Sequence, residues 1–270
     1  HAYTGLCSIP PRYFAKHFGK TLQAFHNDYN FISFTGDGFG FWPYSGPQNY
    51  LIARLLWDTN LDVNQVLGSY FKKLYGPAAS EVAAYYDFLE VCYMRPRKGG
   101  AWLKDHSTIA AFDVYSQSDV AMMRQLLEKA LLAAKGVPLA EKRVQYLIDK
   151  TAPVMQMMEF YFLARKNASG KPDPAEVESC IDAPAKVEAI WKERILSDKR
   201  LGEYAFQNYR KDFDYTAGIR KLWRLDVEKH TAKALSLLQK TAPTEFVRLR
   251  KKFETDPLKE ASIRLATGEA

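Results

Sequence analysis

The sequence predicts a mainly α-helical protein, in which a helical bundle follows a short segment of mixed helix and strand. Over most of the 270-residue chain after Asp58, apolar side chains recur at intervals of three and four residues, which is typical of amphipathic helices. Glycine and proline interrupt this pattern at the expected helix ends. One short run, Asn30–Thr35, has instead the apolar, β-branched and aromatic composition of a buried strand.

The mixed segment consists of a helix, a strand, a loop and a second helix. Its first helix follows Pro10 and Pro11 and ends near Tyr29, because the apolar residues between them share one helical face. The strand leads into a loop rich in glycine and aromatic residues, SFTGDGFGFWPYSG at 33–46, and Pro47 opens the second helix. A single strand cannot satisfy its backbone hydrogen bonds alone. It therefore pairs with extended N-terminal residues or belongs to a larger sheet or barrel.

The remainder of the chain is predicted to be helical almost throughout. Gly76 supplies a C-terminal glycine, Ser118 an N-cap, and Pro153 kinks or splits a long helix. The segments 95–115 and 201–225 lack a regular pattern. The predicted helices cover 61–75, 77–93, 118–135, 139–166, 174–196, 226–239 and 243–253.

The composition limits which classes of protein the chain can belong to. Hydrophobic residues make up 47% of the chain and aromatic residues 14%, which is enough to bury a sizeable core. The net charge is +7, but 38 basic residues stand among 31 acidic ones, and the densest basic runs, 95–98 and 248–252, are short. Because nucleic-acid binding requires a concentrated basic stripe, we expect no nucleic-acid partner. No apolar run approaches the ~18 residues of a membrane span, so we expect none.

Metal and cofactor motifs are also missing from the sequence. Cys7, Cys92 and Cys180 are widely spaced without a CxxC pair, which indicates buried free thiols and neither a zinc site nor a disulfide framework. Nucleophile-elbow, P-loop, HExxH and EF-hand patterns are absent. The glycines at 36–40 lack the third glycine and the βαβ context of a dinucleotide site. We therefore expect no metal and no cofactor.

The glycine-aromatic loop is the candidate binding site. Asp37 directly follows the predicted strand, at the end where barrels and open α/β sheets bind ligands. Its carboxylate can accept hydrogen bonds from sugar hydroxyls or take part in acid/base chemistry. Trp42, Phe41 or Tyr44 can offer an apolar face to a pyranose ring. In the alternative, the loop is structural: its rings pack under the next helix and Asp37 caps a turn.

A longer pattern carries a resemblance to a known family. It consists of PQNYLIARLLWD at 47–58, LDVN at 61–64, YFKKLYGPAA at 70–79 and YYDFL at 85–89. These stretches resemble glycoside-hydrolase-like proteins grouped as domain of unknown function 4838, common in polysaccharide-degrading bacteria. In that family a barrel's last helix reads Y-x-x-A-x-L-L-W-D, and a YGPAA turn begins a helical region. Similar helix starts occur after the barrel in hexosaminidase and glucuronidase families. The resemblance therefore identifies a broad group of related families better than one member of it.

The resemblance implies a division of the chain and a role for it. Residues 1–57 would be the closing end of a (β/α)₈ barrel, with Phe31–Thr35 as its last strand, and 58–270 an appended helical domain. Glycosidases use two carboxylates, usually from earlier strands, so the catalytic residues stay unassigned. The chain would be the C-terminal segment of an extracellular or periplasmic glycoside hydrolase. It would contact a glycan through Asp37 and Trp42 and pack against the upstream barrel portion of the same protein.

Two alternatives from other classes stay open. The chain could be a non-catalytic carbohydrate-binding module, which predicts an exposed aromatic platform without a carboxylate pair. It could also be a structural helical module that contacts other proteins, which predicts that Phe41 and Trp42 are fully buried. The start at His1 without a methionine suggests a processed or excised segment.

Overall fold

The computed structural model describes residues 9–29, 41–96, 109–198, 210 and 217–254, and the regular structure within these ranges is entirely helical. The mainly α fold class is thus confirmed. The predicted strand at 31–35 and Asp37 lie outside the described residues. The elements are α1 (Ala15–Tyr29), α2 (Trp42–Trp57), α3 (Val63–Tyr75), η1 (Gly76–Ala78), α4 (Ala79–Met94), η2 (Ile109–Val114), α5 (Gln117–Ala134), α6 (Pro138–Ser169), α7 (Pro174–Ile181), α8 (Ala183–Trp191), η3 (Lys192–Leu196), α10 (Ala217–Thr241) and α11 (Pro243–Phe253).

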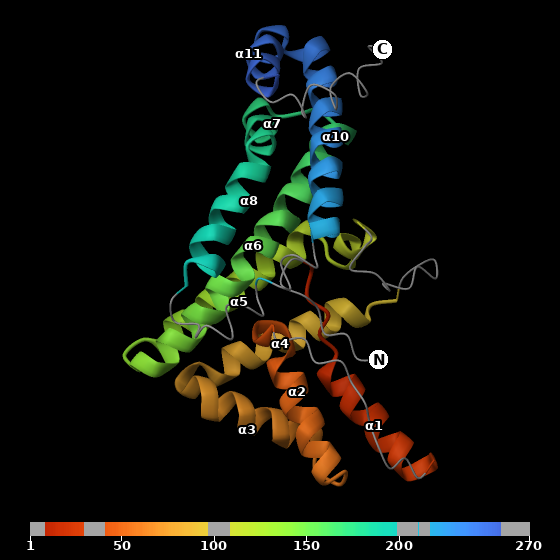
Figure 1. The fold of residues 1–270 in the computed structure, drawn as a ribbon, viewed down its shortest axis with the longest axis vertical. Helices are drawn as coiled ribbons and strands as arrows, with labels where there is room; N and C mark the ends of the chain where they lie inside the picture. The colour runs from red at the N-terminus through yellow and green to blue at the C-terminus, as the bar shows by residue number, and fades with distance from the viewer. Residues whose placement is uncertain (1–8, 30–40, 97–108, 199–209, 211–216, 255–270) are drawn as a thin grey trace.

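The helix α6, at 32 residues, is the longest helix of the described ranges, and several other helices pack against it (Figure 1). The helix α5 precedes it as a hairpin partner, while α8 and α10 pack along its C-terminal half. At one end α7, α10 and α11 pack together, and at the other end α1, α2 and α3 gather beside α4. No helix in the described ranges is both long enough and apolar enough to cross a membrane.

The helix α2 begins earlier than its sequence predicts. It starts at Trp42 and passes through Pro47, so the last residues of the predicted glycine-aromatic loop form its first turns. Pro47 has no N–H to donate to the carbonyl of Pro43, four residues before it. The buried hydroxyl of Tyr86 in α4 donates to that carbonyl instead, at 2.7 Å. The hydrogen bond from Tyr86 therefore replaces the helical hydrogen bond that Pro47 cannot make. Pro47 lies inside α2, although the sequence placed it at the start of the helix.

Other helix ends agree with the sequence in part. Gly76 ends α3 with a φ of 53°, as expected for a C-terminal glycine. The cap of α5 is Ser116 and not Ser118: Ser116 Oγ accepts from the N–H of Asp119, whose carboxylate accepts from the N–H of Ser116.

The long C-terminal helices differ from their predicted extents. The helix α6 is continuous through Pro153. The predicted helix at 174–196 is divided at Asp182 into α7 and α8, because Pro184 in the first turn of α8 cannot donate a hydrogen bond to the preceding turn. The helix α10 begins at Ala217, well before residue 226.

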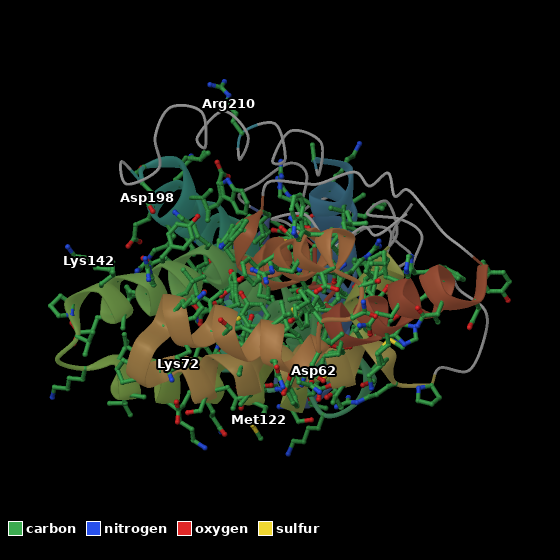
Figure 2. The ribbon with its side chains drawn as sticks, turned by 90° about the horizontal axis from the view of Figure 1, so that it is seen from below. Asp62, Lys72, Met122, Lys142, Asp198 and Arg210 are labelled. Atoms are coloured by element: carbon green, nitrogen blue, oxygen red, sulfur yellow. The ribbon has the colours of Figure 1, made fainter. Side chains whose placement is uncertain are left out.

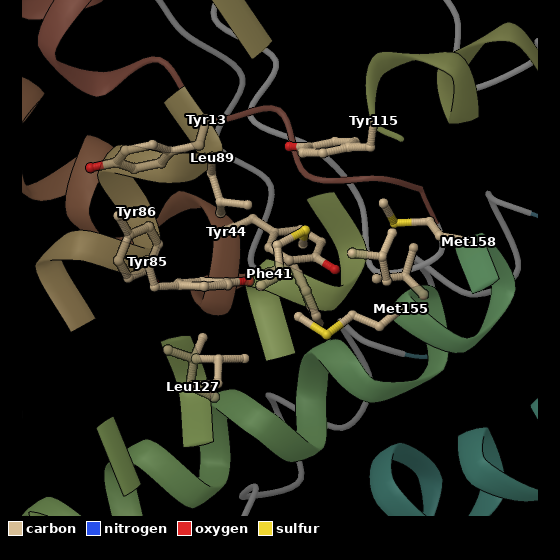
Figure 3. Packing of buried hydrophobic residues seen from close by; sticks show 14 of the residues in the cluster. Tyr13, Phe41, Tyr44, Tyr85, Tyr86, Leu89, Tyr115, Leu127, Met155 and Met158 are labelled. Atoms are coloured by element: carbon tan, nitrogen blue, oxygen red, sulfur yellow. The ribbon is translucent and has the colours of Figure 1, made fainter. Parts of the chain in front are cut away.

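One large buried cluster extends from Ile9 to Val227 and takes side chains from α1 and α2 as well as from the bundle (Figure 3). The rings of Tyr13 and Tyr86, from α4, lie 4.9 Å apart between centroids. A smaller cluster joins α7, α10 and α11. Charged side chains such as Lys72 and Lys142 extend from the periphery (Figure 2).

Cys92 and Cys180 are buried thiols, as expected from their spacing, and neither forms a disulfide with any residue of the described ranges. Burial is the main cause that raises the pKa of Cys92 and of Cys180 to about 12 in each case. Both thiols are therefore protonated and unreactive at neutral pH.

Candidate functional site

Trp42 is the predicted site residue whose ring lies at the surface. It is the first residue of α2, and 45% of it is exposed. Its ring leans against Tyr70 of α3, with centroids 6.4 Å apart and planes 41° apart. Tyr50 packs on Tyr70 in turn, at 5.2 Å. The exposed indole is therefore backed by rings from two helices.

Gly46 allows this close packing. A Cβ at Gly46 would lie 2.7 Å from the indole of Trp42 and 2.8 Å from the hydroxyl of Tyr70, closer than real Cβ contacts come. At Gly46, the neighbour that approaches is the indole of Trp42 itself.

Phe41 and Tyr44 have different surroundings from Trp42. Both side chains are fully buried, and their rings meet edge to face with centroids 4.7 Å apart. They belong to the large core cluster (Figure 3). In this structure their faces are covered by protein, so of the three predicted rings only Trp42 presents a face to solvent. Asp37, the fourth predicted site residue, is outside the described ranges.

The ring of Trp42 packs against a group of buried tyrosines. Tyr70 is one of them, with Tyr13, Tyr85 and Tyr86. Burial, as the main cause, raises the pKa of all four hydroxyls above its ordinary value. The phenols are therefore neutral at physiological pH and cannot act as bases. The Tyr86 hydroxyl donates to the carbonyl of Pro43. Three of the four, Tyr70, Tyr85 and Tyr86, lie in the tyrosine-rich stretch 70–86.

Glu90 of α4 is a buried carboxylate, and it stabilises the start of α1. Its two oxygens accept from the backbone N–H groups of Lys16 and His17, at 3.1 Å and 2.7 Å. These N–H groups lie in the first turn of α1, which has no acidic residue of its own. Glu90 thus complements the positive end of the helix dipole. Within the described ranges no group of three His, Cys, Asp or Glu side chains could hold a metal ion.

The C-terminal ends of α1 and α2 form a second aromatic surface. Trp57, the last residue of α2, is 91% exposed, and Tyr29 ends α1 with 75% exposed. Phe25 and Leu56 lie exposed on the same two helices. An open hollow of about 420 Å³ adjoins this surface, and it is lined by Leu22, His26, Leu56, Trp57, Asp58, Thr59 and Asn60.

Comparison with known proteins gives one match. No curated protein and no solved structure matches the chain. A family model described as Domain of unknown function (DUF4838) matches residues 3–87. That range contains Trp42, Gly46 and Tyr70, together with the exposed ends of α1 and α2. Over residues 3–87, the chain is therefore similar to the family Domain of unknown function (DUF4838).

Proposed function

We propose that this chain is part of a carbohydrate-active protein of the glycoside-hydrolase type, in which it supplies substrate contacts and a helical support. The observation that carries the proposal is the half-exposed indole of Trp42, held against Tyr70 over Gly46. A rigid aromatic face can stack on the apolar face of a sugar ring at little cost in side-chain entropy. Asp37, five residues before Trp42 in the sequence, supplies a carboxylate for sugar hydroxyls.

The catalytic carboxylates come from another part of the protein in this proposal. Glycosidases hold two carboxyl groups about 5–9.5 Å apart across the scissile bond. Glu90, the buried carboxylate near this site, caps a helix and is not available for that role. The chain thus forms one wall of the sugar site and supplies neither the general acid nor the nucleophile.

The second aromatic surface, at the ends of α1 and α2, is a candidate binding surface for a partner of the chain. Phe25, Tyr29, Leu56 and Trp57 are large apolar side chains exposed together at the ends of α1 and α2. Exposed apolar patches of this kind mark interaction sites. We assign this surface to the upstream barrel portion implied by the resemblance, and we place the whole protein outside the cytoplasm, in the periplasm or the extracellular space.

The test is a substitution of Trp42 in the intact parent protein. Trp42→Ala should weaken binding of a glycan substrate by several-fold, since an aromatic stacking contact contributes ~0.5–1.5 kcal/mol. Leu132→Ala removes an apolar side chain of α5 that is 72% exposed and belongs to neither of the two proposed surfaces, and it is the control. Affinity is measured by calorimetry over a panel of soluble oligosaccharides. Unchanged affinity in a folded Trp42→Ala protein would refute the role of the ring.

A structural helical module is the alternative that one observation favours. Phe41 and Tyr44 are fully buried, which places much of the loop's aromatic content in the core. Trp42, which this alternative predicts to be buried as well, is 45% exposed. A structural role predicts that Trp42→Ala lowers the free energy of unfolding without changing any glycan affinity. The same two variants therefore separate the two functions.

A further inference from the structure

An open hollow of about 610 Å³ lies between α5 and α6, beside the turn that joins them at one edge of the molecule (Figure 1). None of its lining residues belongs to the surfaces around Trp42 and Trp57. The lining residues are Glu128, Leu131, Leu132, Lys135, Glu141, Lys142 and Gln145.

Apolar side chains are well exposed at this hollow. Leu132 of α5 is 72% exposed, and Leu139, in the first turn of α6, is 57% exposed. Val137, between the two helices, is 43% exposed. Exposed apolar side chains that lie close together mark interaction sites. The face of the α5–α6 hairpin therefore has apolar area to bury against a partner.

The charged side chains around the hollow are balanced in sign. Glu128, Lys135 and Lys142 are exposed, and none of them makes an ion pair with any residue of the described ranges. Glu141 accepts a hydrogen bond from the backbone N–H of Gly136 at 2.8 Å and supplies the second carboxylate. Two carboxylates and two ammonium groups give this face no net charge. It therefore favours neither a polyanion nor a polycation, but suits a partner that carries both signs.

Three of these residues form one stripe along the exposed face of α5. Glu128, Leu132 and Lys135 are four and three residues apart, the spacing that places side chains on the same side of a helix. With a rise of ~1.5 Å per residue, Glu128 lies ~6 Å before Leu132 along the helix axis and Lys135 lies ~4.5 Å after it. A negative and a positive charge thus flank an apolar centre at similar distances.

We propose that this face binds a second copy of the chain, with the two α5 helices antiparallel about a two-fold axis at Leu132. A two-fold interface brings the same surface of both copies together, so each contact between different residues occurs twice. In this alignment Leu132 packs on its counterpart, and Glu128 of each copy lies opposite Lys135 of the other. A parallel alignment would instead set glutamate against glutamate and lysine against lysine. The stripe is therefore complementary to itself only in the antiparallel dimer.

The first test is the association state of the full chain, measured by sedimentation equilibrium from micromolar to millimolar concentration. We expect a reversible monomer–dimer equilibrium for the wild type. Glu128→Lys and Lys135→Glu each place like charges opposite one another, and each should raise the dissociation constant several-fold. Lys229→Glu, at an exposed position of α10, makes the same change of charge as Lys135→Glu and should leave the dissociation constant unchanged. Circular dichroism confirms that each variant is folded.

The second test mixes the two charge-reversal variants. Glu128→Lys has a lysine at both charged positions of the stripe, and Lys135→Glu has a glutamate at both. Each variant alone should associate weakly. An equal mixture should form a heterodimer several-fold tighter than either homodimer, because every lysine of one copy then lies opposite a glutamate of the other.

Three results would each overturn the proposal. The first is a wild-type chain that stays monomeric at millimolar concentration, and it needs no variant, so misfolding cannot hide it. The second is a dimer that neither charge reversal weakens, which would use another face, such as the aromatic surface around Trp57. The third is a mixture that associates no more tightly than its components. None of these results bears on glycan affinity, because the stripe contains no residue of the surface around Trp42.

Discussion

Gly46 determines how closely the indole of Trp42 can pack on Tyr70. Because an added Cβ would lie under 3 Å from both side chains, Gly46→Ala should lower the free energy of unfolding by ~1–3 kcal/mol, the cost of overpacking. Gly68→Ala, inside α3, is the matched control, since nothing lies within 4 Å of its Cβ position. That control should be neutral or stabilise by up to ~1 kcal/mol through helix propensity. Equal effects of the two variants in urea denaturation would contradict the packing seen at Trp42.

Lys150 is a fully buried ammonium group. It donates to the carboxylate of Asp198 and to the carbonyl of Arg194, each at 2.5 Å. Breaking a buried ion pair by removing one partner is strongly destabilising, so Lys150→Met should lower the free energy of unfolding by ~3–5 kcal/mol. The double variant Lys150→Met, Asp198→Asn should recover part of this loss. A double variant less stable than the single variant would argue against the pairing.

Among the elements, α2 depends on α4 for the completion of its hydrogen bonding. The Tyr86 hydroxyl donates to the Pro43 carbonyl that Pro47 leaves without a partner in the helix. Tyr86→Phe should therefore cost ~1–3 kcal/mol, the cost of an unsatisfied buried acceptor. Tyr29→Phe, at an exposed position, is the control and should change the unfolding free energy by less than ~0.5 kcal/mol. Thermal unfolding of the two variants gives the comparison.

The contact between α7 and α11 depends on pH. Glu178 of α7 accepts from Arg248 and Lys252 of α11, and the hydrogen bond from Arg248 is the main cause that lowers its pKa from 4.5 to about 2. A carboxyl group with a depressed pKa stabilises the fold above its ordinary pKa, and this contribution is lost as the pH falls from 4.5 towards 2.

Hydrogen exchange of the α11 amides should therefore accelerate across this pH window, relative to the intrinsic rate. Salt should weaken the effect, because the groups are exposed. Glu178→Gln should reduce the pH dependence, and the part that stays comes from Asp182 and Glu245, whose carboxylates also pair with Lys252 and Arg248. If the variant kept the same pH profile as the wild type, another group would have to be responsible.

Helix content was predictable here because most helices bury a face that shows in the spacing of apolar residues. Helix ends were less predictable where a distant element decides them. Pro47 suggested a start for α2, but the contact from Tyr86 in α4 lets the helix run through it. Likewise the sequence could place Trp42 in a candidate site but could not show that Phe41 and Tyr44 are buried, since that depends on the packing of other helices around α2.

At the scale of the whole molecule, one core joins the N-terminal helices to the bundle. The hydroxyl of Tyr115 donates to the carbonyl of Pro11, 104 residues earlier, and Tyr13 packs on Tyr86. The bundle thus fixes the orientation of α1 and α2, which carry both Trp42 and the aromatic surface around Trp57. The helical bundle therefore holds these two surfaces in place.

If Trp42 contacts a sugar, as we propose, its indole N–H resonance should respond to the ligand. The chain has five tryptophans, so a ¹⁵N-tryptophan-labelled sample gives few side-chain signals, and Trp42→Phe assigns one of them. On titration with a panel of soluble oligosaccharides, we predict that the Trp42 signal shifts in a saturable manner while the signals of buried Trp191 and Trp223 stay in place. A Trp42 signal that no oligosaccharide moves would show that the indole does not contact a sugar.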